Sequence, residues 1–112
     1  MQRRVLVGLW ESRLVAIHSF ANKGTEDIFN QVGSKVARKT CPEAVWPVAR
    51  RKLEMLNAVT RLSDLAIPLG NRLEALQRDR KGQHSVRINQ QYRVCFRWTD
   101  AGVEDVAITD YR

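Results

Sequence analysis

Residues 70–96 read G-N-R-L-E-A-L-Q-R-D-R-K-G-Q-H-S-V-R-I-N-Q-Q-Y-R-V-C-F, and this stretch decides how the chain is expected to fold. Polar and apolar residues alternate on either side of R-D-R-K-G (78–82), a charged segment that ends in a turn-forming glycine. Alternation on both sides of a turn is typical of a β-hairpin. The hairpin is expected to expose its basic connection and to carry most of the chain's reactive side chains.

The chain has an excess of positive charge. Its 19 lysines and arginines against 12 aspartates and glutamates give a net charge of +7, and the isoelectric point is near 10.1. Such an excess favours a polyanionic partner: nucleic acid, an anionic membrane surface or an acidic protein. The length of 112 residues and the hydrophobic content of 44% fit one domain with a single core.

The two cysteines, Cys41 and Cys95, form no C-x-x-C motif or cysteine–histidine cluster, so we expect no metal site. Cys95 lies in an apolar strand and is interpreted as a small core residue. The apolar run at residues 5–10 is too short for a secretion signal or a membrane span. We therefore expect a cytoplasmic protein with no membrane anchor and no small-molecule cofactor. Residues 1–14 are interpreted as an extension that is either disordered or not native.

Two helices are expected in the N-terminal half. Thr25 is a candidate N-cap for a short helix that ends at Gly33, and residues 34–40 are interpreted as a basic loop. The sequence T-C-P-E (40–43) resembles a capping box that would precede a longer helix. Pro47 either kinks this helix or marks its first turn. Its apolar residues at helical spacing are Val45, Ala49, Leu53, Leu56 and Val59.

Five other segments have the composition or the alternation of strands. They are residues 15–20, 72–76, 84–89, 92–98 and 103–108, of which the third and fourth are either one bent strand or two neighbours. Tyr92, Phe96 and Trp98 share one face and are interpreted as core residues, with a base-stacking platform as the alternative. The predicted fold class is α+β, with two N-terminal helices packed on an antiparallel sheet of three to five strands.

Several motifs occur together in an order that is specific to one family. They are I-x-S-F (17–20), A-R-R-K-L-E-M-L (49–56), P-L-G-N-R-L-E-A-L (68–76), D-R-K-G-Q-H-S-V-R-I-N-x-Q-Y-R-V-C-F (79–96) and the ending D-Y (110–111). Together they resemble HigB-type toxins of the RelE/ParE superfamily, from bacterial type II toxin–antitoxin systems. The resemblance extends from Ile17 to Arg112, which is almost the whole chain.

The resemblance implies a RelE-like microbial RNase fold for residues 15–112. It also implies an endoribonuclease (an mRNA interferase) that works without metal, enters the ribosomal A site and arrests translation and growth. The implied partners are a cognate HigA-like helix-turn-helix antitoxin, the ribosome and mRNA. The alternative is a catalytically weak or inactive module of the same fold, which blocks the ribosome or gyrase or acts only in operon control.

Arg93 matches a sheet arginine that binds the scissile phosphate in the family, with a salt bridge to Asp110 or Glu104 as the structural alternative. Arginine suits this role because its planar guanidinium stays charged and matches two phosphate oxygens. Arg87 lies six residues earlier and would share the face of Arg93 on a regular strand. Further RNA contacts are expected from Arg78, Arg80, Lys81 and Arg87, with a solvated surface or, for Arg80, an ion pair as the alternative.

RNA cleavage also needs a base for the 2′-hydroxyl and an acid for the leaving oxygen. Many relatives end in Asp-Tyr-His, but this chain ends in Asp110, Tyr111 and Arg112, and arginine can hold phosphate but cannot act as a base near neutral pH. Glu74 is either a base or one half of a surface ion pair. The catalytic candidates are Arg93, Asp110 as base or positioning group, Tyr111 as proton donor or stacking ring, Arg112 as phosphate ligand, and His84, for which a packed structural residue is the alternative.

Overall fold

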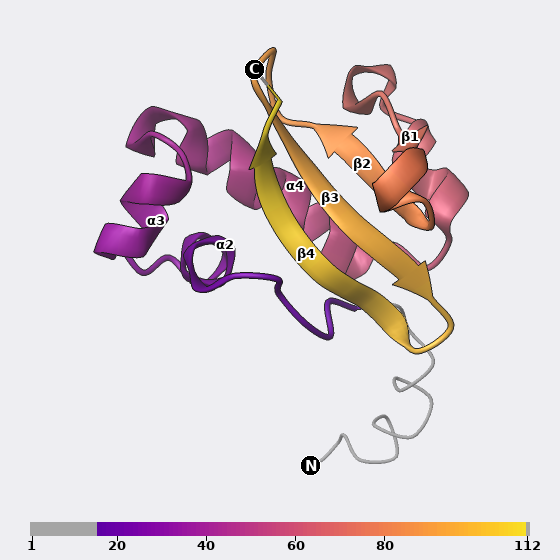
Figure 1. The fold of residues 1–112 in the computed structure, drawn as a ribbon, viewed down its shortest axis with the longest axis horizontal. Coiled ribbons are helices and arrows are strands. Elements are labelled where there is room, and N and C mark those ends of the chain that lie inside the picture. The colour runs from indigo at the N-terminus through magenta and orange to yellow at the C-terminus, as the bar shows by residue number, and fades with distance from the viewer. Residues whose placement is uncertain (1–15, 112) are drawn as a thin grey trace.

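The computed structural model describes residues 16–111, so the expectations for residues 1–14 and for Arg112 lie outside the described part of the chain (Figure 1). Four strands form one antiparallel sheet in the order β1-β2-β3-β4. Their bounds are β1 Glu74–Ala75, β2 Gln83–Arg87, β3 Tyr92–Thr99 and β4 Gly102–Asp110. The predicted α+β class is confirmed.

A tight turn at Asn89 makes β2 and β3 two neighbouring strands rather than one bent strand. The Asn89 Oδ1 atom accepts hydrogen bonds from the backbone N–H groups of Gln91 (2.8 Å) and Tyr92 (2.7 Å). Asparagine favours such turns because its short side chain imitates a backbone acceptor. The reversal places Arg87 directly opposite Arg93 in the sheet.

Residues 16–20, the described part of the strand predicted at residues 15–20, do not form a continuous strand. Ile17 and Phe20 make only isolated parallel bridges to Val103 and Val106 at the outer edge of β4. Asp105 lies between the two bridges with a φ of 54°, and its N–H donates to the side chain of Ser19. This left-handed residue turns the edge of β4 away from continuous pairing.

Helix α2 spans Lys23–Phe29 and begins three residues earlier than the Thr25 cap predicts. Asn22 is the N-cap, because its Oδ1 accepts from the backbone N–H of Thr25 (2.8 Å). Thr25 is instead fully buried, and its hydroxyl accepts from the backbone N–H of Ile108 in β4 (3.0 Å). The helix ends before the predicted Gly33, since Gln31 adopts a φ of 63°.

A third helix, α3 at Lys35–Thr40, replaces the predicted basic loop. The Ser34 side chain caps it by accepting from the backbone N–H of Ala37 (3.0 Å), and Ala37 is fully buried. A side chain on Gly24 of α2 would overlap the hydroxyl of Thr40, so the two helices pack backbone to backbone. This helix could not be predicted from apolar periodicity, because it has only six residues and one buried position.

Helix α4 spans Trp46–Ala58 and follows a 3₁₀ turn at Glu43–Val45. The predicted capping box is wrong, since the Thr40 hydroxyl donates to the carbonyl of Val36 in α3. Pro47 lies in the first turn of α4, where backbone N–H groups have no acceptor within the helix. The proline therefore does not kink the helix. The predicted apolar stripe is confirmed: Ala49, Leu53 and Leu56 are fully buried, and Val45 and Val59 pack at its margins.

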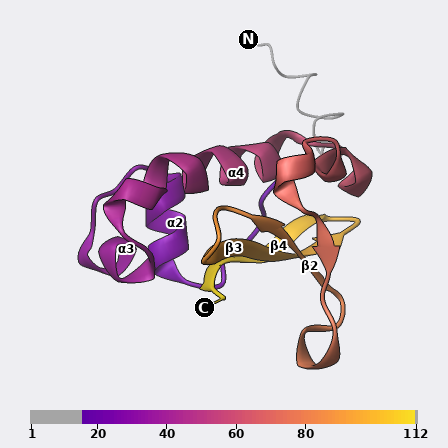
Figure 2. The same cartoon turned by 90° about the horizontal axis from the view of Figure 1, so that it is seen from above.

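The sheet has one covered face and one open face. Helix α4 runs across the covered face, and α2 and α3 lie beside it at one end (Figures 1 and 2). The core between α4 and the sheet contains the predicted ring residues Tyr92, Phe96 and Trp98, of which Phe96 is fully buried. The connection between β1 and β2 projects from the open side, away from α4 (Figure 2).

Candidate functional site

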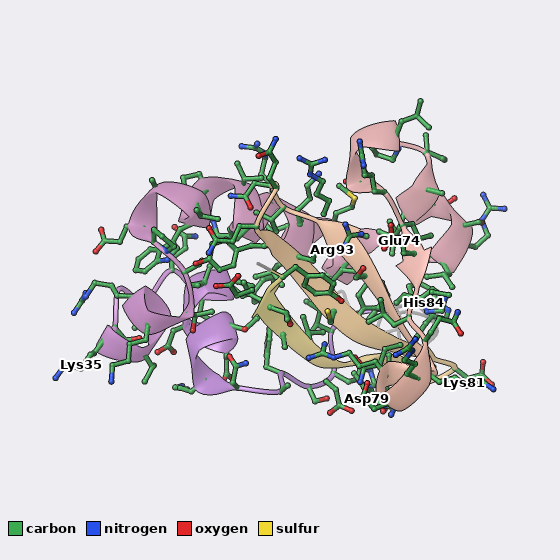
Figure 3. The ribbon with its side chains drawn as sticks, turned by 45° about the horizontal axis from the view of Figure 1, so that its top comes forward. Lys35, Glu74, Asp79, Lys81, His84 and Arg93 are labelled. Atoms are coloured by element: carbon green, nitrogen blue, oxygen red, sulfur yellow. The ribbon has the colours of Figure 1, made fainter. Side chains whose placement is uncertain are left out.

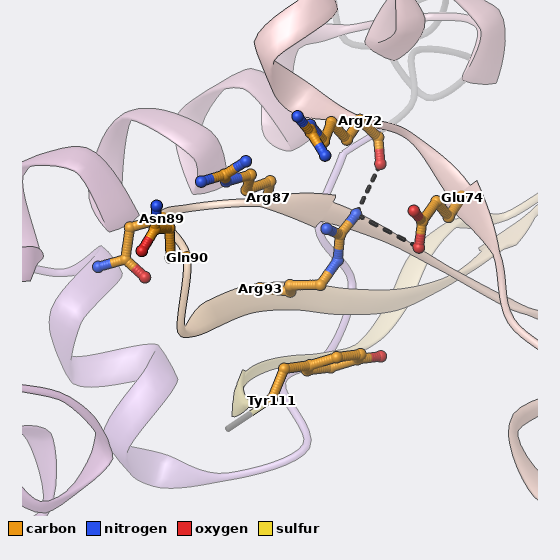
Figure 4. Close-up of a pocket in the computed structure, with 7 residues that line it drawn as sticks. All are labelled: Arg72, Glu74, Arg87, Asn89, Gln90, Arg93 and Tyr111. Carbon is orange, nitrogen blue, oxygen red and sulfur yellow. Dashed lines mark hydrogen bonds and ion pairs between the residues drawn. The ribbon is translucent and has the colours of Figure 1, made fainter.

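Arg93 lies on the open face of β3, because its neighbours Tyr92 and Val94 face the core. Its side chain is nevertheless only 11% exposed. Its Nε donates to the hydroxyl of Ser85 (2.7 Å). Its Nη2 donates to the carbonyl of Arg72 (2.6 Å) (Figure 4). The same Nη2 lies 3.8 Å from Oε1 of Glu74. The ion-pair partner of Arg93 is therefore Glu74, not the Asp110 or Glu104 that was predicted as the structural alternative.

The register of the sheet brings these groups together. Glu74 of β1 pairs with Ser85 of β2, and Arg87 of β2 pairs with Arg93 of β3. Arg87 and Arg93 therefore share one face, as predicted, but for a different reason. They are partners on neighbouring strands, whereas the prediction placed them on a single regular strand. Figure 3 shows Glu74 and Arg93 near each other, with Asp79 and Lys81 at the projecting connection and Lys35 at the far end of the molecule.

The carbonyl that holds Arg93 is aimed by an unusual backbone conformation. Arg72 has a φ of 46°, a left-handed conformation that costs free energy for a non-glycine residue. The preceding Asn71 is fully buried and holds this turn: its Nδ2 donates to the carbonyl of Leu65 (3.0 Å), and its Oδ1 accepts from Lys52 Nζ of α4 (2.5 Å). Helix α4 is thereby connected to the site through Asn71.

A pocket of about 520 Å³ opens in front of the Arg93 guanidinium. Its lining residues are Arg72, Glu74, Arg87, Asn89, Gln90, Arg93 and Tyr111 (Figure 4). Three arginines and one carboxylate give the pocket a positive balance, which favours an anionic ligand. We call it the Arg93 pocket.

Tyr111 closes one side of the Arg93 pocket. The Arg93 Cζ atom lies 5.9 Å from the centre of the Tyr111 ring, within the range of a cation–π contact. The Tyr111 hydroxyl is 3.6 Å from the Cys95 sulfur. Burial, and then the contact with Cys95, raise the pKa of the Tyr111 phenol above its usual value of 10. The phenol is therefore protonated at neutral pH.

Cys95 is buried, as predicted, but it is not part of the hydrophobic cluster between the helices and the sheet. It lies on the same face of β3 as Arg93, beneath Tyr111. Cys95 is 1% exposed, and Tyr111 is one of the residues that cover it.

His84 is not part of the Arg93 pocket. Its neighbour Ser85 faces Arg93, so alternation along β2 turns His84 toward the covered face. There the imidazole stacks on Phe96, with ring centres 6.1 Å apart. The alternative interpretation, a packed structural histidine, is the one that the structure supports.

The other predicted site residues lie around the Arg93 pocket rather than in it. Asp110 accepts a hydrogen bond from Nε2 of Gln91 (3.0 Å) and lines a second pocket, together with Arg80. Arg78 and Lys81 are exposed in the projecting connection, as predicted. Of the predicted RNA-binding residues, only Arg87 lines the Arg93 pocket.

Sequence reasoning missed Ser85 and Arg72 and treated Glu74 only as an alternative. Ser85 could have been found from the sequence, because it is a small polar residue between His84 and Val86 in a predicted strand. Nothing in the sequence points to Arg72, because it contributes a backbone carbonyl whose direction depends on the left-handed turn. Contacts of this kind depend on register and on backbone direction, which composition does not encode.

Within residues 16–111, no helix is long and apolar enough to cross a bilayer, and no three histidine, cysteine or acidic side chains gather as metal ligands would.

Comparisons with known proteins agree with this architecture. Residues 18–111 match the family described as the RelE-like toxin of the type II toxin–antitoxin system HigB. Toxin HigB-1 of Vibrio cholerae serotype O1 is 44% identical over 70 residues, which cover 62% of this chain and 70% of that protein. An uncharacterised protein of Haemophilus influenzae is 32% identical over 65 residues, or 58% of this chain and 64% of that protein. Because the family match covers most of the chain, the protein belongs to the HigB family of RelE-like toxins from type II toxin–antitoxin systems.

Proposed function

We propose that this toxin cleaves mRNA on the ribosome as an endoribonuclease, with Arg93 as the ligand of the scissile phosphate. The observation that carries the proposal is the way Arg93 is held. Ser85 and the Arg72 carbonyl fix its guanidinium at the wall of a positively lined pocket. A fixed cation can stabilise charge that develops on a phosphate without first having to reorganise.

The chemistry needs three groups, and the Arg93 pocket offers a candidate for each. A base takes the proton of the 2′-hydroxyl, and the 2′-oxygen attacks the adjacent phosphorus. The bond from phosphorus to the 5′-oxygen breaks, and an acid protonates that oxygen. The products are a 2′,3′-cyclic phosphate and a free 5′-hydroxyl. Arg93, supported by Arg72 and Arg87, would stabilise the charge on the phosphate oxygens.

Glu74 is the candidate base and Tyr111 the candidate acid. The Glu74 carboxylate lines the Arg93 pocket beside the guanidinium, whereas His84 faces the core and Asp110 lies outside this pocket. The raised pKa of Tyr111 keeps a proton on the phenol that can be donated to the leaving oxygen. This assignment replaces the earlier candidates His84 and Asp110 as proton acceptors.

The test is a translation reaction programmed with a defined mRNA, in which new 5′-ends are mapped with and without the toxin. We expect in-frame cleavage by the wild type and a rate about 10²–10³ lower for Arg93→Ala, the usual loss when one charge-stabilising donor is removed. Arg97→Ala is the matched control, since Arg97 lies on the same strand, pairs with Asp105 and lines neither pocket. Translation arrest without new 5′-ends would sink the nuclease proposal.

Two observations favour a second candidate function. Glu74 already pairs with Arg93, so a phosphate must compete with this carboxylate, and the terminal histidine of many relatives is replaced by Arg112. A chain of this kind could bind and block the ribosome or gyrase, or act only in operon control, without cleaving RNA. Comparison of the wild type with Arg112→His separates the two: cleavage only in the histidine variant would show that the natural chain does not act as a nuclease.

A toxin of a type II system has an antitoxin as its partner. We propose that this antitoxin is a HigA-like helix-turn-helix protein, that the remaining partners are the ribosome and mRNA, and that the toxin acts in the cytoplasm. The positive Arg93 pocket and the net charge of +7 suit such polyanionic targets.

A further inference from the structure

Lys52 of α4 is half-buried, whereas the other lysines within residues 16–111 are all exposed. Its Nζ donates to Oδ1 of Asn71 (2.5 Å), and it forms no ion pair with a carboxylate of the described residues. Burial, and then the charge of the neighbouring Arg51, lower the pKa of the Lys52 ammonium. Lys52 therefore gives up part of its hydration for a contact with a neutral amide.

The bond from Lys52 fixes which way the Asn71 amide faces. An ammonium has only donors, so it must meet the oxygen of the amide rather than the nitrogen. The Nδ2 end then donates to the carbonyl of Leu65 (3.0 Å) and contacts the sulfur of Met55 (3.1 Å). The fully buried side chain of Asn71 is thereby held at both of its ends.

Asn71 directly precedes the residue whose carbonyl holds Arg93. Its backbone N–H donates to the carbonyl of Pro68 (2.8 Å) and closes a 3₁₀ turn at Leu69–Asn71. Arg72 ends this turn with a φ of 46° and a ψ of 57°. A left-handed residue of this kind persists only where the surrounding contacts hold it, and the buried side chain of Asn71 supplies such contacts next to it.

We propose that Lys52 is a positioning residue for Arg93: its ammonium fixes Asn71, and Asn71 fixes the Arg72 carbonyl to which the guanidinium donates (Figure 4). Where it concerns cleavage, this proposal rests on the proposed function, because it takes Arg93 as the ligand of the scissile phosphate. Lys52 lines neither of the two pockets, so it acts on the reaction only through these contacts. A change in α4, on the covered face, then alters the direction of a guanidinium on the open face.

A purely structural role for Lys52 leads to a different expectation. If its bond to Asn71 only stabilised the loop, a folded variant without the ammonium would hold Arg93 as the wild type does. A positioning role requires that Arg93 changes in a protein that remains folded. The guanidinium itself separates the two cases, because its Nε bonds to Ser85 of β2 and its Nη2 bonds to the Arg72 carbonyl.

The first measurement compares the Arg93 guanidinium in Lys52→Met and in Arg51→Met. Methionine keeps an unbranched stem and removes the ammonium, and Arg51 is an exposed neighbour on α4 whose loss changes the net charge equally. Nitrogen–proton NMR records the Nε–H and Nη2–H signals, which are assigned by their absence from Arg93→Ala. In Lys52→Met we expect rotation about the Cζ–Nη2 bond to become about tenfold faster, as the loss of one hydrogen bond allows, with the Nε–H signal retained. Arg51→Met should leave both signals unchanged.

The second measurement is cleavage of a defined mRNA in a translation reaction. In Lys52→Met, kcat should fall by about 10- to 100-fold, as a small misplacement of a catalytic group can cause. KM should change little, because the charge of Arg93 stays in the pocket. Lys52→Arg keeps a cationic donor and should restore the Nη2–H signal and most of the cleavage. Lys52→Met added to Asn71→Ala should cause no further loss, since both changes interrupt the same series of contacts.

Three outcomes would overturn the positioning role: a folded Lys52→Met whose Nη2–H signals match the wild type, no rescue by Lys52→Arg, or a further loss of cleavage when Lys52→Met is added to Asn71→Ala. Circular dichroism checks the fold, and Lys52→Leu replaces Lys52→Met in both measurements if the methionine variant does not fold. The result is separable from the cleavage test. A wild type that does not cleave contradicts the nuclease alone, because the NMR comparison needs no RNA and still decides what holds Arg93.

Discussion

Both faces of the sheet contain fully buried residues, and the faces differ in what buries them. Val86, Val94 and Phe96 lie under α4 and are at most 1% exposed. Their alternating neighbours Ser85 and Cys95 are also at most 1% exposed, but on the open face, beneath Arg93, Tyr111 and the loop that carries Arg72. Burial alone therefore does not distinguish core from site in this protein.

The difference teaches that each face serves a separate purpose. Apolar side chains on the covered face stabilise the fold by leaving water. On the open face the buried guanidinium of Arg93 carries a desolvation cost, which is offset by its hydrogen bonds, by Glu74 and by the Tyr111 ring. The covered face is expected to determine stability, and the open face is expected to determine binding and cleavage.

The largest loss of stability is expected from Phe96→Ala on the covered face. A fully buried phenylalanine that is truncated to alanine leaves a cavity, and we expect a loss of about 3–5 kcal/mol in the free energy of unfolding. Tyr111→Ala on the open face is the matched truncation, with an expected loss below about 1 kcal/mol, because Tyr111 is 45% exposed. Urea unfolding measures both, and equal losses would erase the distinction between the faces.

Asn71→Ala tests the junction between the two faces. It removes the bonds to the Leu65 carbonyl and to Lys52, and a loss of about 1–3 kcal/mol in unfolding free energy is expected. Without Asn71, the turn at Arg72 should lose its left-handed conformation, and its carbonyl should no longer hold Arg93. RNA cleavage should therefore fall even when the variant is fully folded at the assay temperature. A variant that is less stable but cleaves at the wild-type rate would show that the Arg72 carbonyl does not need Asn71.

Alkaline pH should lower the free energy of unfolding through Cys41, which is buried among the helices. Burial raises the pKa of the Cys41 thiol from 9.0 to about 11, so the native state keeps a proton that the unfolded state releases near pH 9. The free energy of unfolding should therefore fall as pH rises from 9 to 11, by at most about 1.4 kcal/mol per pH unit for this group. Unfolding under reducing conditions should show a flatter profile for Cys41→Ala between pH 9 and 10, and an unchanged slope would contradict this origin.

The smallest change in stability is expected for Glu74→Gln. Its ion pair with Arg93 is partly solvated, with the Glu74 side chain 58% exposed, so the effect on unfolding should be below about 1 kcal/mol. Glu54→Gln on α4 is a close control, because Glu54 also pairs with an arginine and is 59% exposed. The two should differ in cleavage: a base in the Arg93 pocket is worth about 10²–10⁴ in rate, whereas Glu54→Gln should cleave normally. Equal cleavage by both variants would remove Glu74 as the base.

Much of the architecture was predictable because it depends on the spacing of apolar residues within each helix and strand. The apolar stripe of α4 and the alternation along β2, β3 and β4 predicted the α+β class. The family motifs pointed to Arg93, which the structure places in a pocket. The short helix α3 and the cap at Asn22 escaped prediction, since six residues hold too little periodicity and Thr25 imitates a cap.

The alternation of residues, the place of the basic connection and the motifs of the toxin family can all be read in the sequence. The contacts of Glu74 and the Arg72 carbonyl with Arg93, the direction of His84 and the place of Tyr111 in the lining of two pockets depend on the folded structure. The physical reason is that alternation specifies a side within each strand. The partners across strands and turns depend on register and on the left-handed residue at position 72, which arise only when the sheet closes against α4.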